Sequence, residues 1–92
     1  VRDVAFVIDD DVEADKMLNI ARDMGKELLE KVSIFDVYSG KGITQGKKSL
    51  GLRFIYRAPE RTLTDDEVGQ VHSGIVKHIV DLTGAKIRGE GN

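Results

Sequence analysis

The chain has 92 residues and a mass of 10.2 kDa, which is enough for one domain. It has no cysteine, which excludes disulfides, thiolate metal sites and cysteine nucleophiles, and it has no apolar run near the roughly 20 residues of a membrane-spanning helix. Its 14 basic and 16 acidic residues give a net charge of −2, which argues against a protein that coats nucleic acid through charge alone.

The first third of the chain predicts a strand followed by a helix. The β-branched and aromatic run at residues 4–8 is typical of a strand, and the aspartates at residues 9–11 can cap a helix and complement its dipole. Apolar residues recur at helical spacing over residues 12–24, and Gly25 is well placed to end that helix. The apolar positions are Ala14, Met17, Leu18, Ala21 and Met24.

The middle of the chain predicts two strands joined by a loop. Residues 28–38 are long enough for a strand, but their broken alternation indicates a β-bulge or bend near Phe35. Glycines and polar residues predict a loop over residues 39–46. Residues 49–57 alternate without a break, which predicts the clearest strand of the chain.

The last third of the chain predicts a second helix and a short strand. Pro59 ends the preceding strand, and Thr64 with Glu67 forms a capping box, flanked by Leu63 and Val68 at the positions of a hydrophobic staple. Helical spacing then joins Val68, Val71, Ile75, Ile79 and Leu82, and Gly84 closes the helix. Residues 85–88 alternate as a last strand, and we expect residues 89–92 to be a frayed tail.

The resulting order βαββαβ predicts an α+β fold, the ferredoxin-like sandwich, with a four-stranded antiparallel sheet and both helices on one face. The first and third strands are then adjacent at the centre of the sheet. Alternation predicts that one set of residues faces the helices: Val4, Phe6, Ile8, Leu50, Leu52 and Phe54. It places a second set on the uncovered face: Ala5, Val7, Ser49, Gly51 and Arg53.

The uncovered face combines small central residues with basic side chains. Residues 37–58 contain no acid and five bases, namely Lys41, Lys47, Lys48, Arg53 and Arg57. Such a face allows a planar ligand to approach the sheet while Arg53 or Lys48 reaches phosphates. Two alternatives are open: the basic segment is a solvated hairpin, or the small residues pack against another domain of a parent protein.

Several other patterns do not amount to a site. Gly46-Lys47 lacks the remaining residues of a phosphate-binding loop, and His72 and His78 are six residues apart, on different faces of a helix. The acidic run at residues 9–15 lacks the closing loop of a cation site and is typical of a solvated helix cap. Ser49 has no evident base and no carboxylate pair stands out, so we expect no catalysis, cofactor or metal in this chain alone.

Four segments, in this order and at these separations, carry a resemblance to a known family: Arg2-Asp3-Val4-Ala5-Phe6, Phe35-Asp36-Val37-Tyr38, Gly46-Lys47-Lys48-Ser49-Leu50 and Glu60-Arg61-Thr62-Leu63-Thr64. Together they resemble the ferredoxin-fold anticodon-binding domain at the C-terminus of the bacterial phenylalanyl-tRNA synthetase β chain. The resemblance covers nearly all of residues 1–92. With a start that lacks methionine, it implies a fragment of a longer, cytoplasmic β chain.

The resemblance also implies a function. The family's domain binds the anticodon stem-loop of tRNA(Phe), while ATP- and Mg-dependent aminoacylation occurs on the α subunit of an (αβ)2 enzyme. The family's contacts with the first anticodon base, a guanine, match Ala5, Asp36 and Ser49, and a carboxylate suits the N1 and N2 donors of guanine. From the residues we add Tyr38 as a stacking neighbour and Lys47, Lys48 and Arg53 as phosphate contacts.

The strand parity of Asp36 opposes this assignment, because Val32 and Ile34 share its parity in the same predicted strand. A second class of function also fits the fold, namely an amino-acid-binding regulatory module of the ACT type or a protein-interaction module. That alternative needs a ligand pocket at a subunit boundary, and the sequence shows no motif for one. Binding of free phenylalanine or of an anticodon stem-loop would separate the two.

Overall fold

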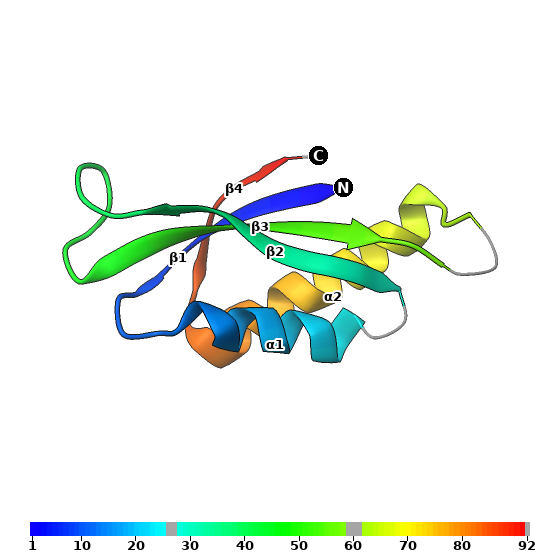
Figure 1. The fold of residues 1–92 in the computed structure, drawn as a ribbon, viewed down its shortest axis with the longest axis horizontal. Helices are drawn as coiled ribbons and strands as arrows, with labels where there is room; N and C mark the ends of the chain where they lie inside the picture. The colour runs from blue at the N-terminus through cyan, green and yellow to red at the C-terminus, as the bar shows by residue number, and fades with distance from the viewer. Residues whose placement is uncertain (26–27, 59–61, 92) are drawn as a thin grey trace.

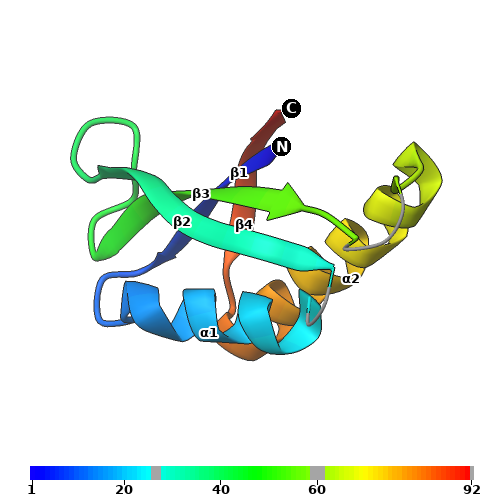
Figure 2. The same cartoon turned by 45° about the vertical axis from the view of Figure 1, so that its right-hand side comes forward.

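A computed structural model describes residues 1–25, 28–58 and 62–91, with the backbone alone at residues 90–91. Its six elements are β1 (Arg2–Asp9), α1 (Ala14–Gly25), β2 (Leu29–Tyr38), β3 (Lys47–Tyr56), α2 (Asp65–Thr83) and β4 (Lys86–Gly91). The sheet has the order β2-β3-β1-β4 with every neighbouring pair antiparallel, and both helices lie on one side of it (Figures 1 and 2). The predicted ferredoxin-like α+β fold is confirmed.

Local signals set the ends of the helices. The Thr64 side chain accepts a hydrogen bond from the Glu67 amide while the Glu67 carboxylate accepts one from the Thr64 amide, so the predicted capping box is confirmed. Gly84 adopts a left-handed conformation with φ of 73° and its N–H bonds to the Val80 carbonyl, which ends α2 as predicted. Helix α1 begins two residues later than predicted, after a turn at residues 9–12. Pro59 and Asn92 lie outside the described residues.

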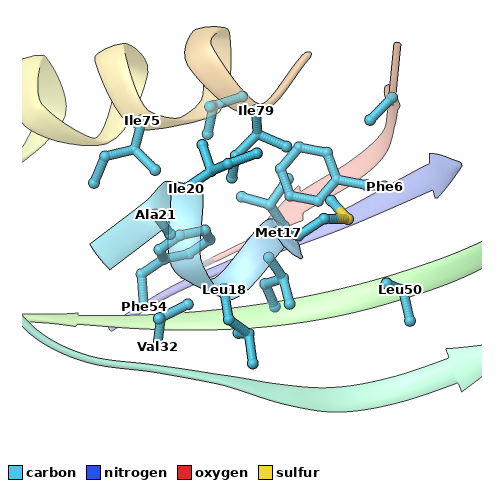
Figure 3. Packing of buried hydrophobic residues seen from close by; sticks show 14 of the residues in the cluster. Phe6, Met17, Leu18, Ile20, Ala21, Val32, Leu50, Phe54, Ile75 and Ile79 are labelled. Carbon is cyan, nitrogen blue, oxygen red and sulfur yellow. The ribbon is translucent and has the colours of Figure 1, made fainter. Parts of the chain in front are cut away.

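The core fills the space between the sheet and the two helices (Figure 3). The six strand residues predicted to face the helices are each at most 1% exposed. Met17 and Ala21 of α1 and Ile75 and Ile79 of α2 close over them, also without exposure. Each fully buried side chain of this size contributes roughly 1.5–3 kcal/mol to folding, so this face carries most of the hydrophobic stabilisation.

The predicted apolar stripes extend further than the core does. Met24 and Leu82, the last members of the two helical patterns, are 40% and 53% exposed. Both residues lie in the last turn of their helices, which end at Gly25 and Thr83. The apolar spacing therefore predicted the helices correctly, and the last member of each stripe is exposed.

The last strand is longer than predicted. Residues 89–91, expected to be a frayed tail, continue β4 and pair with Asp3, Val4 and Ala5 of β1. Main-chain hydrogen bonds in a sheet require no particular side chain, so glycine-rich composition did not prevent pairing. The expectation of a frayed tail was wrong for residues 89–91.

Candidate nucleic-acid interface

The helix-free face of the sheet is organised in rows that run across the strands. In one row Asp36 of β2 stands opposite Gly51 of β3, and Gly51 stands opposite Ala5 of β1. In the adjacent row Ser49 of β3 lies between Tyr38 and Val7. Residues directly opposite each other project from the same face. The structure therefore brings Ala5, Asp36 and Ser49 to one face in neighbouring rows.

A β-bulge in β2 explains how Asp36 reaches this face. Ile34 pairs with the buried Leu52, so it lies on the helix side, and Asp36 already pairs with Gly51. The register shift between them accommodates one extra residue, Phe35, which resets the alternation. The predicted bulge near Phe35 is confirmed, and it removes the conflict between the strand parity of Asp36 and its place beside Ala5.

The centre of the face is not flat, because the Phe35 ring covers Gly51. A Cβ added at residue 51 would lie 2.8 Å from Cζ of Phe35, so the close approach of the ring requires glycine there. The guanidinium carbon of Arg53 lies 5.0 Å from the centre of that ring. Arg53 also donates to both carboxylate oxygens of Asp3, at 2.9 and 3.0 Å, and these bonds hold the pKa of Asp3 below its usual value.

A second bulge brings an arginine over the adjacent row. Ala5 pairs with Gly89 and Phe6 with Ile87, which leaves Arg88 as the extra residue of β4. Arg88 Nη1 lies 3.4 Å from the hydroxyl oxygen of Ser49, and its guanidinium lies 5.7 Å from the centre of the Tyr38 ring. Ser49 is only 1% exposed beneath this group. The small centre predicted from the sequence therefore has two covers, Phe35 and Arg88.

Comparison with known proteins identifies the family of this chain. Residues 1–88 match the family described as the ferredoxin-fold anticodon binding domain. The chain belongs to this family. The match covers β1, β2, β3, both helices and the first three residues of β4, including the two rows that hold Ala5, Asp36 and Ser49.

Three of the curated relatives carry the same name. The chain is 68% identical to the phenylalanine–tRNA ligase beta subunit of Syntrophus aciditrophicus (strain SB), over 95% of its own length and 11% of that protein. It is 47% identical to the beta subunit of Shouchella clausii (strain KSM-K16) and 45% identical to that of Clostridium tetani (strain Massachusetts / E88), with the same two coverages. The matches favour anticodon binding over the amino-acid-binding alternative. The chain spans about a tenth of the length of these relatives.

The two lysines of the anticodon-binding domain that were expected to contact phosphate lie on opposite sides of the sheet. Lys47 stands opposite Asp9, forms an ion pair with it and shares the alternation of the helix-free face. Lys48 stands opposite the buried Ile8, and its ammonium group donates to the Asp10 carbonyl at 3.1 Å. The register thus places Lys48 on the helix side, because adjacent strand residues point to opposite faces.

Of the two histidines of α2, His72 serves in packing. His72 is 6% exposed, its Nδ1 lies 2.7 Å from the Tyr56 hydroxyl, and its ring meets Phe54 edge to face. Burial raises the pKa of the Tyr56 phenol, so this hydroxyl stays protonated. Over residues 1–25, 28–58 and 62–91 no cluster of histidine and carboxylate side chains could hold a metal ion, and no helix has the length and apolarity to cross a membrane.

Proposed function

We propose that this domain binds the anticodon stem-loop of tRNA(Phe) as the C-terminal domain of a phenylalanine–tRNA ligase β subunit in the cytoplasm. The parent enzyme is an (αβ)2 assembly whose α subunit attaches phenylalanine with ATP and Mg. The observation that carries the proposal is the meeting of Ala5, Asp36 and Ser49 on one helix-free face in a member of the anticodon-binding family. This domain supplies binding and orientation, and catalysis lies elsewhere in the enzyme.

The chemistry of the site suits guanine at the first anticodon position. The exposed carboxylate of Asp36 accepts hydrogen bonds only, and guanine presents two donors, N1–H and the N2 amino group, on its Watson–Crick edge. Ala5 adds no polar group to the same row, so a planar base can lie over it beside the Phe35 ring, which covers Gly51. Tyr38, Arg53 and Lys47 border the site and supply stacking and phosphate contacts.

The deciding experiment compares base preference in two proteins. Anticodon stem-loop RNAs with each of the four bases at the first anticodon position are titrated into the wild-type domain and into Asp36→Asn. We expect the wild type to prefer guanine. In Asp36→Asn the preference for guanine over the other bases should fall roughly 5- to 150-fold, because base contacts are worth about 1–3 kcal/mol. The physical reason is that the new amide N–H₂ can face the guanine donors. Asp23→Asn, an exposed site on α1 with the same change of charge, is the matched control.

A purely structural role for Asp36, at the bulge of β2, predicts a different result. Asp36→Asn would then lower the thermal stability and leave the ratio of guanine to adenine binding unchanged. That outcome would remove Asp36 from the site. In the whole enzyme, the specific role predicts a rise in KM for tRNA(Phe) with kcat little changed, because the anticodon contributes binding at a distance from the chemistry.

A further inference from the structure

Arg88 is a cation of the helix-free face that lies beside the proposed base site. The bulge of β4 leaves it between the row of Ala5 and the row of Ser49, and its guanidinium reaches across to the Tyr38 ring. No role for Arg88 could be predicted from the sequence, because a single arginine near the end of a short strand carries no signal of its own.

Among the side chains that the structure describes, Arg88 is held differently from its charged neighbours. Arg53 is held by the Asp3 carboxylate and Lys47 by that of Asp9. Arg88, by contrast, contacts a hydroxyl and an aromatic ring, and it has no carboxylate partner among the side chains that the structure describes. Its 3.4 Å bond to Ser49 is long, so little is lost when a better acceptor replaces it. Most of its five N–H donors thus remain available to a ligand.

We propose that Arg88 is a further specificity-determining residue, which donates to O6 and N7 of the guanine whose N1 and N2 face Asp36. The inference rests on the function proposed above. Asp36 and Arg88 come from opposite edge strands, β2 and β4, and Ala5 in β1 lies between these strands. In the structure the Arg88 guanidinium reaches across β1 to Ser49 and Tyr38, so it turns back toward a base over Ala5 in order to bind it. Guanine has acceptors at O6 and N7, which match the paired donors of an arginine.

This arrangement explains rejection of adenine better than Asp36 does alone. Adenine carries an amino group in the place of O6, and that donor would face the guanidinium donors of Arg88. Binding of the base by Arg88 also frees Ser49, because the guanidinium leaves the Ser49 hydroxyl when it turns toward the ligand. The hydroxyl that is 1% exposed in the structure then becomes available to the RNA.

The test pairs single atoms of the RNA with single side chains of the protein. Stem-loops carry guanine, 7-deazaguanine (no N7 acceptor) or inosine (no N2 amino group) at the first anticodon position, and binding is measured to wild type, Arg88→Met and Arg53→Met. We expect 7-deazaguanine to weaken binding to the wild type about three- to tenfold, the effect of one lost hydrogen bond. Arg88→Met should bind the guanine and 7-deazaguanine RNAs equally, whereas Arg53→Met, on the same face, should keep the wild-type ratio.

The inosine RNA separates a contact from a structural role. Because N2 faces Asp36, Arg88→Met should keep the ratio of guanine to inosine binding, whereas a site distorted by the substitution would lose both ratios. The inference is overturned if 7-deazaguanine binds the wild type as well as guanine, if Arg88→Met keeps the guanine to 7-deazaguanine ratio, or if both ratios fall together. If the wild type shows no preference for guanine over the other bases, the proposed function itself fails.

Discussion

The two faces of this sheet come from the same strands but are built on different principles. On the helix side, Phe6, Leu52 and Phe54 are fully buried by side chains that arrive from two helices. On the other side, Gly51 and Ser49 are covered by single side chains, Phe35 and Arg88, each placed by a bulge. Removing helix-side contacts leaves a cavity in the core. Removing a cover on the other side uncovers a surface that can accept a ligand. The first face provides stability and the second provides the site.

The largest effect should come from truncating the helix side. Leu52→Ala removes a side chain with no exposure from the centre of the sheet and should cost about 2–5 kcal/mol of unfolding free energy, measured by denaturant titration. Val7→Ala, on the half-buried open face of β1, should cost no more than about 1 kcal/mol. Equal costs at the two positions would show that the faces do not differ as described.

A smaller effect should come from crowding the cover at Gly51. The new methyl group of Gly51→Ala meets the Phe35 ring at 2.8 Å and should destabilise the domain by about 1–3 kcal/mol in thermal or denaturant unfolding. The same substitution in a Phe35→Ala background should be neutral or stabilising, because alanine loses less entropy than glycine on folding. If the cost persists without the ring, the requirement for glycine has another origin.

The smallest effect concerns two adjacent lysines. Lys47→Ala should lower the slope of log K against log salt concentration for stem-loop binding by about 0.7, the value for one single-strand phosphate contact. Lys48→Ala, on the helix side beside Asp10, should leave the slope unchanged. A change of slope on removal of Lys48 would mean that the RNA wraps around the sheet edge. The interface would then extend beyond one face of the domain.

Sequence alone was sufficient wherever the controlling interaction is local. The alternation from Ser49 to Phe54 gave both faces of β3 correctly, and Thr64 with Glu67 gave the start of α2. Such signals depend on neighbours along the chain, and these neighbours stay the same in any fold. The fold class follows from the order of these elements.

Sequence was insufficient where the face on which a residue lies depends on the register with the neighbouring strand. A bulge shifts the alternation by one residue, and its position depends on the register with the neighbouring strand. Alternation therefore indicated that β2 is irregular without placing Asp36, whose role came from family resemblance. It could not show that Phe35 lies over Gly51 or that Arg88 lies over Ser49. A bulge in one strand opposite a glycine in its partner is the signal that could have found the first of these.

The pairing of β1 with β4 has a consequence for the order in which the domain can form. Among the strands of this domain, the one that is synthesised first lies in the middle of the sheet, and one of its two neighbours is the one that is synthesised last (Figure 1). Until residues 86–91 are present, one side of β1 is an unpaired edge, open to the strands of other chains. Completion of the sheet therefore depends on contacts that are distant in the sequence, which slow folding, and the nascent domain is exposed to aggregation until its final residues emerge.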